Sequence, residues 1–199
     1  MRPYFRHGAA AMIAALSAQM MFVPASLAQA ADQKPPADQP EQKPPEDKPE
    51  QKPPAEKPAQ KPLEDLKPAF DALRAKDYAK AERILKPMAD NKDPRALFLL
   101  GAEVYGFAQS PLFNLAKAIP LLRESAERGF PRAMAVYGGA LAEGAGVPQD
   151  KVEGYKFIAL ASRMQVPGVE AVLAQLAGEM TDEEIERAKK AADAFVPRK

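Results

Sequence analysis

The chain has 199 residues, of which 28 are basic and 27 acidic, with a single histidine and no cysteine or tryptophan. The histidine is His7, inside the segment that we predict to be removed, so the mature chain would have no thiol nucleophile, no Ser-His-Asp triad and no zinc site of the common kinds. Without cysteine no disulfide supports the fold, and packing has to hold it.

The first 30 residues have the pattern of an export signal. Basic residues lead, the apolar run Ala9–Val23 follows, and Ala28-Gln29-Ala30 closes the segment. We predict residues 1–30 to be a signal peptide cleaved after Ala30, and hence an exported, periplasmic protein. The apolar run is short for a membrane span and is interrupted by Ser17 and Gln19, so we expect no stable membrane insertion after cleavage. A leader retained as an anchor is the alternative.

Cleavage would also set the charge of the mature chain. It removes two arginines and no acids, which leaves a net charge of 28 − 2 − 27 = −1. A nearly neutral chain argues against a nucleic-acid partner.

Residues 31–62 form a Lys/Pro/Glu-rich segment with a nine-residue repeat that restarts at Gln33, Gln42, Gln51 and Gln60. The segment lacks aromatic and β-branched residues, so we expect it to be disordered. Its ten prolines favour an extended polyproline II arm. No two prolines stand three apart, which favours a spacer over a ligand for a proline-reading module, although a docking role stays open.

From Leu63 onward the apolar residues recur at steps of three and four, the period of helices. We predict eight helices, and five residues have the chemistry of helix caps: Asp77, Asp93, Asn114, Asp150 and Thr181. The third helix should run from Pro94 to about Ala108. Pro87 and Pro120 fall inside predicted helices and should bend or shorten them.

The helices repeat in pairs. Three residues recur 37 positions later: Pro94, Ala96 and Gly101 are matched by Pro131, Ala133 and Gly138. The caps Asp77, Asn114 and Asp150 recur at steps of 37 and 36, and the one-residue difference falls in the loop 107–113. Alanine and glycine at repeated positions should let helix axes approach closely where they cross.

These residues resemble the pattern of Sel1-like repeats, the α/α relatives of tetratricopeptide repeats, in their exported bacterial form. The second copy carries Ala133, Gly138, Gly144, Gly146, Val147, Asp150 and Ala161, and the first keeps Ala96, Leu100, Gly101, Asn114, Ala118, Ala126 and Gly129. The resemblance covers residues 63–196. It implies an all-α, right-handed α/α solenoid of about four helical hairpins that serves as a scaffold for another protein or peptide.

No catalytic, cofactor-binding or metal-binding residues are predicted. The hydroxyl residues Ser110, Ser125 and Ser162 lack a lysine three positions on, and the Gly144-Ala-Gly146 loop follows a helix instead of a strand. The alternative is an envelope hydrolase or cell-wall-binding protein that uses carboxylates alone. The carboxylate pair Glu183 and Glu186 is more simply interpreted as a solvated helix face.

A binding surface can be predicted from helical spacing. If Ala96, Leu100 and Val104 pack inward, then the opposite side of that helix carries Phe98, Ala102 and Tyr105, and the next copy carries Ala135, Gly139 and Ala142. We predict that these six residues, the first-helix strip, receive a peptide or partner helix. The equal alternative is that Phe98 and Tyr105 belong to the core. The resulting expectation is a non-enzymatic, monomeric adaptor.

Overall fold

The computed structural model describes residues 63–199, so the predicted signal peptide 1–30, its cleavage after Ala30 and the Lys/Pro/Glu-rich segment 31–62 lie outside the described residues. The described part is helical and contains no strand. Its elements are η2 (Leu63–Leu66), α2 (Lys67–Arg74), α3 (Tyr78–Asp90), α4 (Pro94–Leu99), η3 (Leu100–Tyr105), α5 (Leu115–Glu127), α6 (Pro131–Glu143), α7 (Lys151–Arg163), α8 (Val169–Ala177) and α9 (Asp182–Asp193). The all-α prediction is confirmed over these residues.

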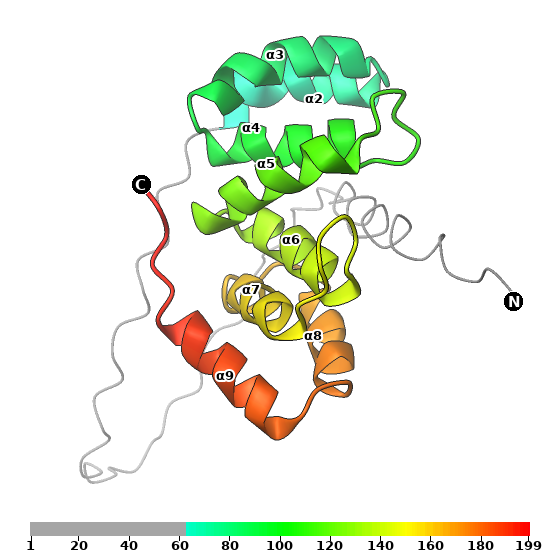
Figure 1. The fold of residues 1–199 in the computed structure, drawn as a ribbon. Helices are drawn as coiled ribbons and strands as arrows, with labels where there is room; N and C mark the ends of the chain where they lie inside the picture. Colours follow the sequence, from blue (N-terminus) through cyan, green and yellow to red (C-terminus); the bar gives the residue numbers. More distant parts are fainter. Residues whose placement is uncertain (1–62) are drawn as a thin grey trace, which may run out of the picture. The chain divides into compact units, whose positions relative to one another are not determined.

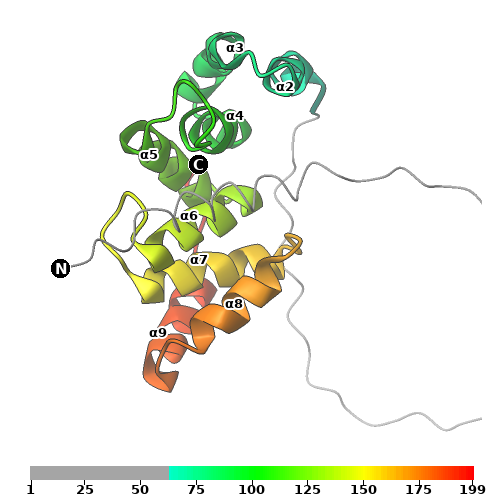
Figure 2. The same cartoon turned by 90° about the vertical axis from the view of Figure 1, so that its right-hand side faces the viewer.

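The helices stack in chain order as hairpins (Figure 1). The α2–α3 hairpin packs on α4 and η3, these pack on α5, and α5 packs on α6. The α6–α7 hairpin is followed by α8 and α9, which both contact α7, so α2–α3 and α8–α9 are the two ends of the stack (Figure 2). Each hairpin contacts its neighbours, as expected for a repeat protein.

The predicted caps start the second helices of successive hairpins. The side chains of Asp77, Asn114 and Asp150 accept hydrogen bonds from the backbone N–H three residues on, at 2.9, 3.1 and 2.9 Å. Thr181 and Glu184 form the predicted capping box of α9. These side chains satisfy N–H groups that the first helical turn leaves unpaired.

Glycines lie where the helices of a hairpin cross. A Cβ on Gly101 would lie 2.9 Å from Leu122 Cγ and 3.1 Å from the carbonyl oxygen of Ala118, both on α5. A Cβ on Gly138 would lie 2.8 Å from Ile158 Cγ1 and 2.9 Å from the carbonyl oxygen of Gly154, both on α7. The prediction that these small residues permit close crossing is therefore confirmed.

The third predicted helix differs from the α-helical expectation. It is α-helical only to Leu99 and continues as the π-helix η3, which ends at Tyr105 and not near Ala108. All six residues of η3 are buried. The next residue, Gly106, could not carry a side chain, since a Cβ there would lie 2.6 Å from the carbonyl oxygen of Gly101. Pro87 and Pro120 lie within α3 and α5, which continue to Asp90 and Glu127.

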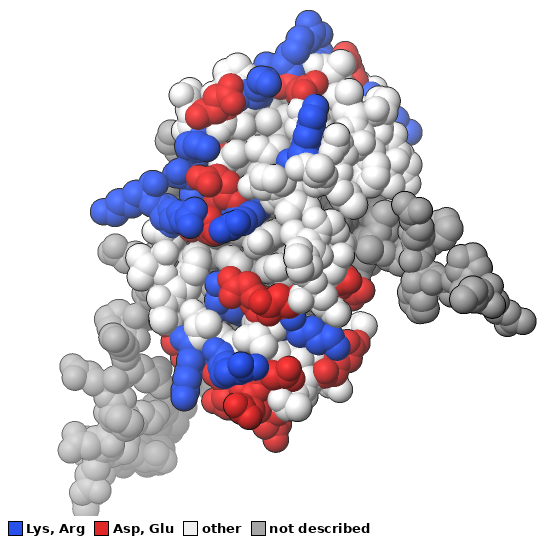
Figure 3. Space-filling view, in the orientation of Figure 1, with Lys and Arg blue, Asp and Glu red and all other residues white. Residues whose placement is uncertain are grey.

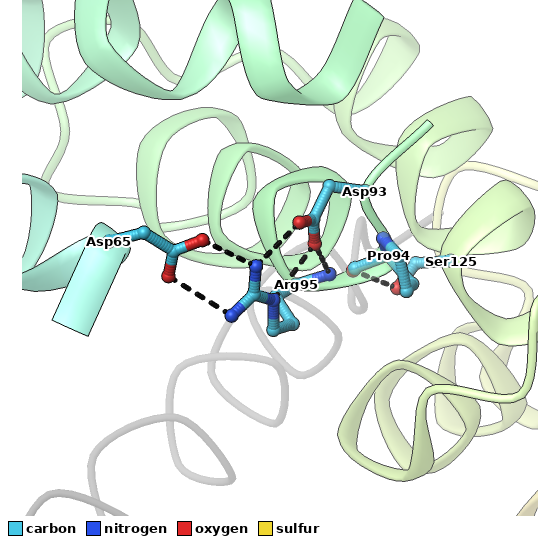
Figure 4. Close-up of polar contacts among 5 residues, drawn as sticks. All are labelled: Asp65, Asp93, Pro94, Arg95 and Ser125. Atoms are coloured by element: carbon cyan, nitrogen blue, oxygen red, sulfur yellow. Dashed lines mark hydrogen bonds and ion pairs between the residues drawn. The ribbon is translucent and has the colours of Figure 1, made fainter. Parts of the chain in front are cut away.

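A buried arginine fixes the start of the stack (Figure 4). Arg95 on α4 donates to Asp65 on η2 at 2.7 and 3.1 Å and to Asp93, the cap of α4, at 2.6 and 3.0 Å. Burial alone would raise the pKa of Asp93, but the hydrogen bonds from Arg95 lower it overall. Beside this cluster, the Ser125 hydroxyl on α5 donates to the carbonyl oxygen of Pro94 at 2.6 Å. These bonds join η2, α4 and α5.

Candidate functional site

The structure places five residues of the first-helix strip inside the molecule. Exposed fractions are 2% for Phe98, 0% for Ala102, 7% for Tyr105, 2% for Ala135 and 8% for Ala142. The prediction that these positions form an open apolar surface is corrected: the core alternative describes them. Gly139 alone is partly exposed.

Phe98 and Tyr105 have partners within the fold. The Phe98 ring lies 5.3 Å from the Phe130 ring, and the Arg132 guanidinium lies 5.3 Å from the centre of the same ring. The Tyr105 hydroxyl donates to the Glu82 carboxylate on α3. Burial and this hydrogen bond raise the pKa of Tyr105 to about 12.

Helical spacing misplaced this face because α4 and η3 are enclosed on all sides: every residue from Arg95 to Tyr105 is buried. A step of about 100° per residue applies to an α-helix, whereas η3 follows the i→i+5 pattern from Leu100 onward. Ala102 and Val104, which were expected on opposite sides, are both 0% exposed. π-Turns often occur at functional sites, which directs attention to the residues around η3.

Gly139 is the one residue of the first-helix strip that is partly exposed. An added Cβ at Gly139 would have no atom of the described residues within 4 Å. Ala135 lies one turn before it on α6 and Ala142 nearly one turn after. Arg132, two turns before Gly139, lies on the same side of the helix. A side chain at Gly139 would therefore meet no described residue, although Ala135 and Ala142 on either side of it are buried.

Glu103 is a functional candidate that the spacing argument missed. It lies on η3, whose residues are all buried, and is 9% exposed. Burial raises its pKa, opposed by attraction to Arg132, and burial lowers the pKa of Arg132 itself. The available signal was that Glu103 is the one charged residue between Arg95 and Lys117. Ionisable groups with shifted pKa values are enriched at functional sites.

A second candidate surface is a groove of about 320 Å³ between α5 and α6. Its lining combines apolar side chains with charged ones: Ile119, Pro120, Tyr137, Val147, Arg123, Glu124, Glu127 and Arg198. Arg198 belongs to the C-terminal segment, whose backbone N–H donates to the carbonyl oxygen of Glu127 at 2.8 Å. The Glu127 carboxylate also pairs with Arg123 at 2.9 Å. Glu124 pairs with Arg128 outside the groove, so each charged group of the lining already has a partner.

On the face drawn in Figure 3, acidic and basic side chains are interspersed with uncharged surface and form no large patch of one charge. The carboxylate pair considered from the sequence, Glu183 and Glu186, is exposed on α9, and Glu186 pairs with Lys189 at 2.8 Å. An exposed, paired carboxylate is a solvated helix face.

Three of the hydroxyl residues have structural roles. Ser125 bonds the carbonyl of Pro94, Ser110 accepts from the N–H of Leu112, and Thr181 caps α9. Within residues 63–199, His, Cys, Asp and Glu side chains form no group of three that could hold a metal ion. Over the same residues, every helix is too short or too polar to cross a membrane.

Comparison with known proteins indicates the fold. No family model matches the chain, and no curated protein matches it. A search of solved structures finds the crystal structure of a protective antigen present in uropathogenic Escherichia coli strains, which displays an SLR (Sel1-like repeat) fold. The two share 18% sequence identity with a TM-score of 0.57. The match covers 64% of this chain and 28% of the antigen's chain, so it spans less than a third of that neighbour.

Proposed function

From the Sel1-like repeat fold that this chain adopts, we propose that it is a protein-binding scaffold, an adaptor that works as a monomer in the bacterial periplasm or cell envelope. The observation that supports this proposal is the stack of hairpins. Their helices cross at Gly101 and Gly138, and their fold is similar to that of the solved SLR structure. Stacked helical repeats present extended surfaces, and binding another macromolecule is their usual work. The antigen's own role is not transferred, since the likeness concerns the fold.

The periplasmic location rests on the sequence pattern of residues 1–30. Its test is the mass and N-terminal sequence of the protein in a periplasmic fraction. We expect a chain that begins at Ala31, and an intact chain found in the cytoplasm would contradict export.

Binding is tested by capture from periplasmic extract. The mature protein is immobilised, and proteins retained above background are identified with and without residues 31–62. We expect the same partner in both cases, because the helical domain provides the surface and the proline-rich segment provides reach. Loss of the partner on deletion of 31–62 would instead make that segment the ligand.

The adaptor proposal also excludes turnover. Purified protein incubated with peptidoglycan and peptide substrates should release no product. Reproducible turnover, lost on substitution of a carboxylate, would contradict the proposal and support the carboxylate-only hydrolase.

A further inference from the structure

The C-terminal segment after α9 folds back over the stack. The Phe195 ring lies 6.0 Å from the Phe157 ring of α7. Further on, Pro197 adjoins Gly129, the glycine that follows α5, since a Cβ on Gly129 would lie 3.1 Å from the proline ring. In Figure 1 this red segment runs from α9 back to the level of α5. The segment therefore returns from the last helix of the stack to the end of α5.

Arg198 makes two contacts with a single residue of α5, Glu127. Its backbone N–H donates to the Glu127 carbonyl oxygen at 2.8 Å, and its guanidinium pairs with the Glu127 carboxylate at 2.5 Å. In a continuing helix that carbonyl would accept from the residue four positions on, but that residue is Pro131, which has no N–H. Glu127 therefore presents a carbonyl and a carboxylate that together recognise one basic residue of a non-helical segment.

The tail holds this place loosely and leaves the groove beside it unfilled. Val196 is 81% exposed and the Arg198 side chain 59% exposed, and ion pairs of exposed side chains contribute little to stability. Arg198 lines the α5–α6 groove, of which about 320 Å³ stays open beside Ile119, Tyr137 and Val147. A space of this volume holds a few side chains, whereas a helix is about 10 Å across. The groove thus fits an extended segment better than a helix.

We propose that the α5–α6 groove binds an extended segment of a partner protein with the order proline, arginine, apolar residue, and that residues 196–199 occupy its entrance until that partner binds. The partner's proline and arginine take the places of Pro197 and Arg198. The tail passes Gly129 and then Glu127, so the next residue of a partner segment enters the groove beside Ile119. Burial of its apolar side chain gives the partner an advantage over the tail. This inference rests on the proposed scaffold function and specifies its partner.

Competition by the tail can be tested with a labelled synthetic peptide of the order phenylalanine, valine, proline, arginine, leucine, leucine. Its binding is measured by fluorescence anisotropy, to the exported protein and to the same protein without residues 196–199. The shortened protein keeps Phe195, which packs on α7. We expect it to bind the arginine peptide about tenfold more tightly, as for a tail released in about one molecule in ten. Equal binding to the two proteins, or binding to neither, would overturn the proposal.

Two further peptides test the chemistry of the partner. A twin with glutamate in place of the arginine should bind the shortened protein at least about tenfold more weakly, the range of a hydrogen-bonded charge. Equal binding of the twins would contradict recognition by Glu127. The third peptide has the sequence of residues 42–50, from the chain's own proline-rich segment. If it bound more tightly than the arginine peptide, the groove would belong to that segment, and the proposed partner would be wrong.

A matched pair of variants locates the site. Pro120→Lys places a long cationic side chain at the groove from within α5, and Pro87→Lys makes the same change at an exposed proline within α3. Neither should lower the melting temperature, because lysine favours a helix more than proline does. In the shortened protein, Pro120→Lys should weaken the arginine peptide by about tenfold, and Pro87→Lys should leave its binding unchanged. Unchanged binding in Pro120→Lys, or an equal loss in both variants, would place the site elsewhere.

Glu127→Gln, nearly the same shape, should remove the preference for arginine over glutamate. Its control is Glu186→Gln, which removes a paired carboxylate on α9 and should keep that preference. An unchanged preference in Glu127→Gln would overturn the proposal. Failure of this site can be distinguished from failure of the scaffold function. If the Pro120→Lys protein still captures the periplasmic partner, the scaffold function stands and the groove is not its binding site.

Discussion

The two central hairpins, α4–η3 with α5 and α6 with α7, have the same crossings but end their first helices differently. Both cross at a glycine, Gly101 or Gly138. Helix α6 ends with Gly144 in the left-handed conformation, at φ 73°, a common helix end. The first hairpin lacks that glycine and ends as a π-helix at Gly106, with φ −90°. The crossing is therefore conserved between the repeats while the helix end is not.

The two hairpins also enclose different side chains at one matched position. Glu103 corresponds to Ala140, 37 positions later, which is 1% exposed. The second hairpin buries a methyl group where the first holds a carboxylate. The first hairpin therefore encloses a charged group at a position where the second encloses only a methyl group.

The largest effect is expected from a substitution at the α6–α7 crossing, the tighter of the two. Gly154→Ala places in α7 the residue that α5 has at the matching position, Ala118. The new Cβ would lie 2.8 Å from the carbonyl oxygen of Gly138 and 2.9 Å from the amide nitrogen of Ala142. Backbone atoms cannot relieve this clash by changing rotamer, as a side chain can. We therefore expect a loss of about 3 kcal/mol of unfolding free energy in urea titrations. A loss below about 1 kcal/mol would mean that the hairpin is looser than described.

Gly101→Ala tests the same crossing in the first hairpin and should destabilise it less. The closest atom to the new Cβ would be Leu122 Cγ at 2.9 Å, and a leucine side chain can shift. We expect a loss of about 2 kcal/mol by the same titration. If Gly101→Ala proved more damaging than Gly154→Ala, the ranking of the two crossings would be wrong.

Removing the caps of α5 and α7 tests whether the two caps contribute equally to stability. Asn114→Ala and Asp150→Ala each remove one side-chain bond to a backbone N–H, and each should lower the unfolding free energy by about 1 kcal/mol. Thermal melts of the two variants should agree closely. A loss confined to one of them would show that only one cap contributes.

The smallest effect is expected at the buried position that holds Glu103 in the first hairpin and Ala140 in the second. Burial raises the folded-state pKa of Glu103, so its stabilising contribution is present below the pKa of the unfolded chain and is lost as pH rises through the folded pKa. Glu103→Gln should therefore raise the melting temperature slightly at neutral pH, and the difference should shrink at acid pH. A variant less stable than the unsubstituted protein at neutral pH would mean that the carboxylate stabilises the fold.

The repeat and the caps could be predicted because they depend on local chemistry. Asp77, Asn114, Asp150 and Thr181 are short polar side chains ahead of periodic apolar segments, and such residues cap helices in most contexts. The crossing glycines were found by their 37-residue spacing.

The binding strip could not be placed from spacing alone. One exposed side was expected for this helix, but every residue of α4 and η3 from Arg95 to Tyr105 is buried, and spacing along one helix does not show which neighbours enclose it. Burial of Phe98 and Tyr105 depends on Phe130 and Glu82, which lie far from them in the chain. The return of Arg198 to Glu127 is likewise a tertiary contact without a local signal.

The orientation of α6 is central, since it turns Gly138 toward α7 and Gly139 away from every other described residue. Its most direct test is a pair of thermal melts, on Gly138→Ala and Gly139→Ala. Gly138→Ala should lower the melting temperature, because its Cβ meets Ile158, and Gly139→Ala should raise it, because alanine favours the helix and meets nothing in residues 63–199. Lower melting temperatures for both variants would contradict the account.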